Sequence, residues 1–112
     1  MTVGTWRNVI AALQASAFDV QYRIKPMRAL DPGTWCRWLI IPVEGYLETG
    51  STGPVPVRDV EWVDVDPMEI VAEGRLIPAR YVDRSEALVR TLRETGAAIE
   101  MVSGFVRVRT EK

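Results

Sequence analysis

A change of hydrophobic period near residue 18 constrains the fold of this chain more than any other feature. Trp6, Val9 and Leu13 recur at helical spacing and predict a helix over residues 5–17, with Thr5 as its N-cap. Apolar and polar residues then alternate over residues 18–25, which predicts a strand with one buried and one solvent-facing side. A helix that runs almost directly into a half-buried strand indicates that helices pack on a sheet.

The C-terminal part of the chain has the same order of helix and then strand. Asp83 and Glu86 have the spacing of a capping box, so we expect a helix over residues 84–95 that is capped by Asp83. A two-residue turn at 103–104 predicts a hairpin within residues 98–110. That turn sets a register that pairs Met101 with Val106, Ile99 with Val108, Val102 with Phe105, and Glu100 with Arg107.

Three further strands are expected between the two helices, at residues 35–41, 43–48 and 57–66. The first is apolar on both faces and therefore predicts a central strand. A loop is expected at residues 49–56, because that segment is rich in glycine, proline and hydroxyl residues. Residues 68–82 are expected to form an irregular covering segment or a short edge strand, because Gly74 and Pro78 interrupt both periods.

These elements predict one α+β domain over residues 1–112. We expect a mainly antiparallel sheet of about six strands with two helices on one face, in the order α-β-β-β-β-α-β-β. At this length the chain can bury enough apolar surface to fold without disulfides.

Composition excludes several kinds of site. The chain has no histidine, which excludes Ser-His and Cys-His catalysis and histidine-ligated metals. Its single cysteine, Cys36, excludes an internal disulfide and a multi-cysteine metal site. A net charge of −1 gives no basic excess for nucleic-acid binding. No apolar run is long enough to cross a membrane, and we expect a cytoplasmic protein without a cofactor or a resident metal.

The segment at residues 57–66 carries the main functional hypothesis. Its charged residues fall on both faces of a regular strand, so the strand must either bulge or extend past the core. Solvated strand ends are the simplest interpretation, and paired carboxylates for metal binding or acid–base chemistry are another. A third interpretation assigns a function to the segment, as a docking surface for a basic protein. Its candidate binding residues are Glu48, Asp59, Glu61, Trp62, Asp64 and Asp66.

The chain also resembles a family of small bacterial proteins known only as a domain of unknown function. The resemblance rests on Trp6-Arg7, Tyr46-Leu47-Glu48, Gly53-Pro54, Arg58-Asp59-Val60-Glu61-Trp62 and the closing helix and hairpin. The end of the last strand, Val108-Arg109-Thr110, departs from the aromatic-glycine pattern of that family. The resemblance implies no catalytic residues, and it implies that residues 46–62 are shared for folding or for binding.

The sequence therefore favours a non-enzymatic protein-interaction domain with an acidic-aromatic surface, for example an immunity or antitoxin-like inhibitor of a basic toxin. The alternative is a small ligand-binding or divalent-metal-binding domain, or an enzyme that uses carboxylates. A homodimer formed by pairing of edge strands is a third possibility.

Overall fold

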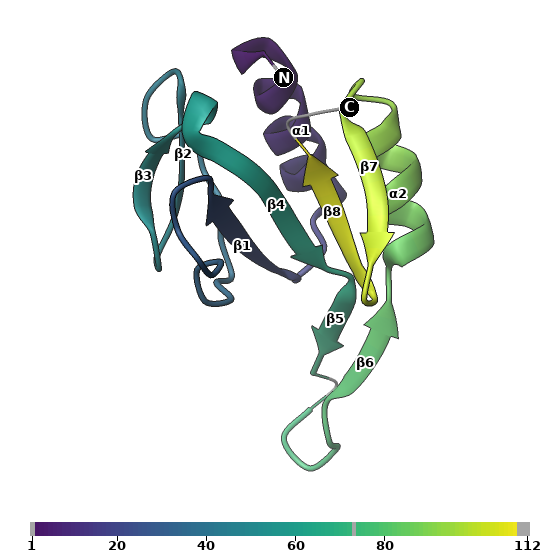
Figure 1. The fold of residues 1–112 in the computed structure, drawn as a ribbon. Helices are drawn as coiled ribbons and strands as arrows, with labels where there is room; N and C mark the ends of the chain where they lie inside the picture. Colours follow the sequence, from purple (N-terminus) through teal and green to yellow (C-terminus); the bar gives the residue numbers. More distant parts are fainter. Residues whose placement is uncertain (1, 73, 110–112) are drawn as a thin grey trace.

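The computed structural model describes residues 2–72 and 74–109, and the predicted α+β fold is confirmed. Helices and antiparallel strands follow one another along the chain as Figure 1 shows. Their bounds are α1 (Val3–Ser16), β1 (Gln21–Pro26), β2 (Tyr46–Thr49), β3 (Gly53–Pro56), the 3₁₀ turn η1 (Val57–Asp59), β4 (Val60–Asp66), β5 (Met68–Val71), β6 (Arg80–Asp83), α2 (Ser85–Arg93), β7 (Ala98–Val102) and β8 (Phe105–Arg109). The eight strands form one four-stranded sheet and two two-stranded sheets, where the sequence predicted a single sheet.

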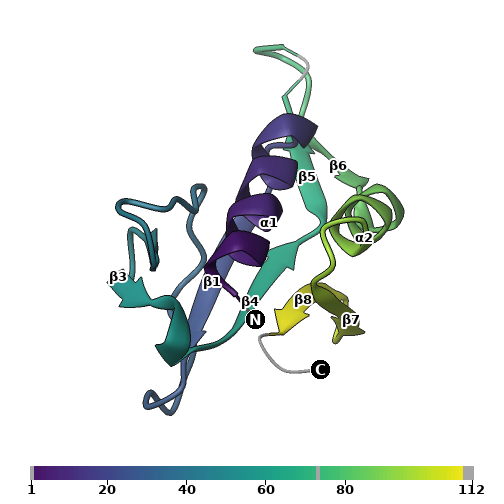
Figure 2. The same cartoon turned by 90° about the horizontal axis from the view of Figure 1, so that it is seen from above.

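The four-stranded sheet has the order β1-β4-β8-β7, and both helices cover the same face of it (Figure 2). Cross-strand pairing aligns Ile24, Val63 and Val108 in one row on the helix side. All three are completely buried against the apolar faces of α1 and α2. Burial of each such side chain stabilises the fold by roughly 1.5–3 kcal/mol, so this row and the helix residues above it form the core.

Helix α1 begins and ends close to the predicted positions, with a different cap. The Thr2 hydroxyl accepts a hydrogen bond from the Thr5 N–H at 3.1 Å, so Thr2 and not Thr5 caps the helix. The helix ends at Ser16, because Ala17 adopts a left-handed conformation with φ of 57°. Only four residues separate this end from β1, as the change of period predicts.

The C-terminal helix and hairpin also agree with prediction in most respects. Asp83 accepts a hydrogen bond from the Ser85 N–H at 2.8 Å, but Arg84 occupies the N-cap position, so the capping box is absent. The predicted register of β7 and β8 is confirmed in every pair. Both turn residues have positive φ, 52° at Ser103 and 85° at Gly104, as a tight hairpin turn requires.

The predicted central strand at residues 35–41 is wrong. This segment is irregular, and its backbone pairs with neighbouring strands only at isolated bridges. Its apolar residues divide between two environments, since Trp35 packs on the side of the sheet opposite the helices and Leu39 lies in the core. The Cys36 backbone exchanges hydrogen bonds of 2.7 and 2.8 Å with Tyr22, and the Gly33 N–H donates to Ile24 at 2.9 Å. The segment therefore covers the outer edge of β1.

The middle of the chain differs from prediction in two places. The predicted strand at 43–48 begins three residues later, at Tyr46, and pairs with β3 inside the segment that was expected to be a loop. The predicted strand at 57–66 begins with η1 and continues as β4. In the pairing of β1 with β4, Lys25 lies opposite Trp62 but Pro26 lies opposite Val60. Glu61 lies between these two pairs and is therefore the additional residue of a bulge. Of the two predicted alternatives, a bulge or an overhanging strand end, the structure therefore has the bulge.

Residues 68–72 and 74–83 form a hairpin that projects from the body of the protein, and we call it the arm. Strands β5 and β6 pair only with each other, and their connecting loop extends past the β7–β8 turn (Figure 1). The sequence predicted a covering segment or an edge strand here. No helix in the described part of the chain is long and apolar enough to cross a membrane.

Candidate functional site

The six residues predicted to bind a partner do not form one exposed surface. Trp62 and Asp64 share one face of β4, and both are buried. Glu61 is half-exposed and pairs with Lys25 at 3.1 Å. The other three lie on different elements, and all three are partly buried: Glu48 in β2, Asp59 in η1 and Asp66 at the end of β4.

Asp64 is the centre of a buried ionic cluster. Its carboxylate has no solvent exposure and lies between two arginines that pair with it across the sheet. Arg107 donates hydrogen bonds of 2.8 and 3.1 Å, and Arg23 donates hydrogen bonds of 3.1 and 3.3 Å. The hydrogen bond to Asp64 raises the pKa of Arg107 above its usual value. We call Arg23, Asp64 and Arg107 the ionic cluster.

Aromatic rings enclose the two guanidinium groups of the ionic cluster. The Arg107 guanidinium lies 3.7 Å from the centroid of the Trp62 ring. Arg23 lies 4.5 Å from the Trp35 ring and 5.2 Å from the Phe105 ring. Each cation–π contact contributes roughly 0.5–2 kcal/mol. The cluster and its rings therefore join β1, β4, β8 and the segment around Trp35 on the open face of the sheet, and Asp64 cannot reach a partner from this position.

A second buried carboxylate fixes the root of the arm. Glu69, which is 8% exposed, accepts hydrogen bonds from the Asp19 N–H at 2.6 Å and from Arg84 at 2.9 Å. The hydrogen bond from the Asp19 backbone, with that from Arg84, lowers the pKa of Glu69. The Arg84 guanidinium also lies over the Phe18 ring at 4.8 Å. These contacts attach β5 to the junction between α1 and β1.

The arm exposes several large apolar side chains. Leu76 is 96% exposed, Tyr81 67% and Ile77 56%. Arg75 precedes Leu76 and is also exposed. Scattered apolar residues on a surface need no explanation, but several on one projecting hairpin indicate an interaction element. Composition did not identify this site, and its only sequence signal was the run Leu76-Ile77-Pro78, which has neither helical nor strand period.

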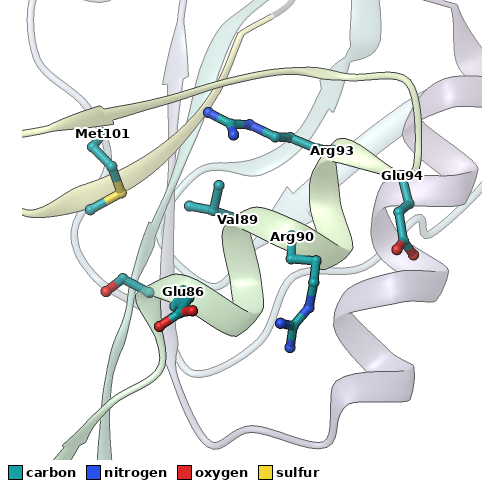
Figure 3. Close-up of a pocket in the computed structure, with 7 residues that line it drawn as sticks. Glu86, Val89, Arg90, Arg93, Glu94 and Met101 are labelled. Atoms are coloured by element: carbon teal, nitrogen blue, oxygen red, sulfur yellow. The ribbon is translucent and has the colours of Figure 1, made fainter.

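A shallow groove lies between α2 and the outer edge of β7 (Figure 3). Its volume is about 560 Å³. Val89 on α2 and Met101 on β7 point toward one another across it, and Met101 is 49% exposed. The residues that line the groove are Ser85, Glu86, Val89, Arg90, Arg93, Glu94 and Met101. Apolar side chains at its centre and charged ones around them suit a protein segment better than a small polar ligand.

The predicted alternative of a carboxylate metal site has little geometric support. Within residues 2–72 and 74–109, no group of three or more cysteine, aspartate or glutamate side chains is placed to hold a metal ion. The most buried carboxylates, Asp64 and Glu69, already accept hydrogen bonds from arginine.

A model of a family described as a family of unknown function, DUF6678, matches residues 1–110. This agrees with the resemblance found in the sequence. Comparisons with curated proteins and with solved structures gave no match.

Proposed function

The chain belongs to this family of unknown function, and we propose that it is a non-enzymatic protein-interaction domain whose contact element is the arm. The observation that carries the proposal is the exposure of Leu76, Ile77 and Tyr81 on a hairpin that projects from the body. Exposure of these side chains costs free energy in the isolated protein, and a partner that buries them recovers it.

The root of the arm supports the same proposal. An interaction element binds better when it is held in one orientation before binding, because less conformational entropy is lost. Glu69 attaches the arm at its root, because it accepts hydrogen bonds from the Asp19 N–H at 2.6 Å and from Arg84 at 2.9 Å, while residues 75–77 nearer the tip are exposed. The arm is therefore oriented at one end and available at the other.

The chemistry of the tip specifies the partner. Leu76 and Ile77 need an apolar pocket, and Arg75 beside them favours a carboxylate at its rim. This differs from the basic partner that the acidic segment predicted. Binding by Glu48, Asp59, Glu61 and Asp66 stays a prediction, but the steering carboxylates of that hypothesis included Asp64, which is buried.

Site-specific photocrosslinking tests the proposal in cells that express the protein naturally. A photoreactive residue replaces Leu76 in one variant and Leu30 in a matched control, because Leu30 is 97% exposed on a turn far from the arm. We expect one defined adduct from position 76 and none from position 30. The proposal is contradicted if position 76 gives no adduct, or if both positions give the same adducts.

A further inference from the structure

We infer that the partner of the arm is a second copy of this chain, and that the arm of each copy lies along β7 in the groove of the other. The inference rests on the proposed function and names the occupant. It begins from two exposed apolar features in the same chain. The first is the projecting arm, which exposes Leu76 and Ile77. The second is the groove between α2 and β7, which is lined by Val89 and Met101. Neither is covered by another described segment.

The two edges of the four-stranded sheet differ in a way that marks β7 as a binding edge. The backbone of β1 is covered by hydrogen bonds to Gly33 and Cys36. Strand β7 has no neighbour on its outer side in the described sheet. It has few of the usual protections of an edge strand, since its sequence AIEMV contains no proline or lysine, its pairing with β8 has no bulge, and its one charged side chain, Glu100, is paired with Arg109.

The position of the arm favours a reciprocal contact between two copies. The arm leaves the body beside the β7–β8 turn and the start of α2, at one end of the same edge (Figure 1). A two-fold axis near that end places each arm beside the other copy's β7. Such an interface is closed, because both copies contribute the same two features. The arm also makes the protein elongated, 45 Å along its longest axis against 27 and 26 Å, and a reciprocal contact fills the space beside it.

The volume of the groove and one carboxylate at its rim agree with this occupant. The groove, at about 560 Å³, is large enough for the side chains of Leu76 and Ile77. Glu86 lies at the rim of the groove, three residues before Val89. A Leu76 side chain buried against Val89 therefore brings Arg75 of the arm within reach of a carboxylate, and the pair adds orientation to an apolar contact.

Sedimentation velocity over a range of concentrations tests the inference with the full chain. We expect a concentration-dependent dimer for the natural protein. Leu76→Asp and Met101→Asp should each weaken dimerisation by about a hundredfold or more, because each places a charge in the apolar contact. Leu30→Asp is the matched control and should leave dimerisation unchanged. Thermal melting checks folding, and all three positions are exposed, so the variants should fold.

Mixing the two variants gives the sharpest result. A heterodimer of Leu76→Asp with Met101→Asp retains one intact contact between an arm and a groove, whereas each variant alone retains none. The mixture should therefore dimerise more tightly than either variant. A natural protein that stays monomeric, a dimer that survives Leu76→Asp, or a mixture no tighter than its components overturns the inference. If the protein is monomeric but position 76 still crosslinks to a different protein, the proposed function stands and only the identity of the partner is wrong.

Discussion

Asp64 lies opposite Arg107 in the pairing of β4 with β8, and its fully buried carboxylate accepts two hydrogen bonds from that arginine at 2.8 and 3.1 Å. Arg23 contacts the same carboxylate from the other neighbouring strand. The residue that looked most like part of an acidic docking surface is thus a structural link between three strands.

We predict that Asp64→Asn lowers the free energy of unfolding by about 3 kcal/mol. The substitution keeps the shape of the side chain and removes its charge, so the two partly buried arginines lose the carboxylate that binds both of them. Urea denaturation followed by tryptophan fluorescence measures the change. The control is Glu100→Gln, which alters a half-exposed ion pair with Arg109 and should cost less than about 1 kcal/mol. Equal losses for the two variants would show that burial of Asp64 has no energetic consequence.

The hairpin turn offers a stabilising substitution. Ser103 has φ of 52° and Gly104 has φ of 85°, and asparagine followed by glycine is the preferred sequence for this geometry. Ser103→Asn should raise the free energy of unfolding by about 0.5 kcal/mol, and Gly104→Ala should lower it by about 1 kcal/mol. Denaturant midpoints measure both, and the prediction fails if the two substitutions act in the same direction.

Glu69 predicts a particular dependence of stability on pH. Its pKa in the folded protein lies below the ordinary value of 4.5, so the stability it contributes is complete above that pH. The contribution is lost as the pH falls through the lower folded pKa. Glu69→Gln should therefore be less stable than the natural protein at pH 7, and the difference should shrink steadily below pH 4.5. Thermal melting across this range measures it, and a constant difference would be evidence against the hydrogen bonds assigned to Glu69.

The absence of a side chain at Gly33 allows the segment beside β1 to cover the edge of that strand. A Cβ atom at this position would lie 2.7 Å from the Ser51 hydroxyl oxygen and 2.8 Å from a Thr52 methyl carbon. Gly33→Ala should therefore displace the segment that pairs with Tyr22 and cost about 1–2 kcal/mol. Hydrogen exchange of the Tyr22 and Cys36 amides should become faster. Gly50→Ala is the milder control, because a Cβ atom at Gly50 would approach no atom closer than the Trp38 ring, at 3.3 Å. Equal effects of the two substitutions would exclude the steric explanation.

The sequence was informative where local spacing determines structure. A two-residue turn at 103–104 leaves one register for the strands around it, and that register is the observed one. The broken alternation of residues 57–66 required a bulge or an overhang, and the bulge lies beside Glu61. In both cases the physical constraint acts between residues that are close in the chain.

Prediction failed where partners are distant in the chain. Asp64 is 41 residues from Arg23 and 43 from Arg107, so no local pattern shows that its charge is neutralised. The apolar run at 35–41 reads as a central strand, because sequence period cannot show that Trp35 and Leu39 pack on different layers. The arm was missed because its strands pair only with each other and leave large apolar side chains exposed, so its sequence need not show the period of a half-buried strand.

The most direct test of the account is the solvent reactivity of Leu76 in cells that express the protein naturally. Hydroxyl-radical footprinting compares the oxidation of Leu76 with that of Leu30, both in the cell and in dilute purified protein, where each side chain is almost fully exposed. We predict that Leu76 is protected in the cell while Leu30 keeps its reactivity. Equal reactivity of Leu76 in the two conditions would contradict the proposal that the arm binds a protein.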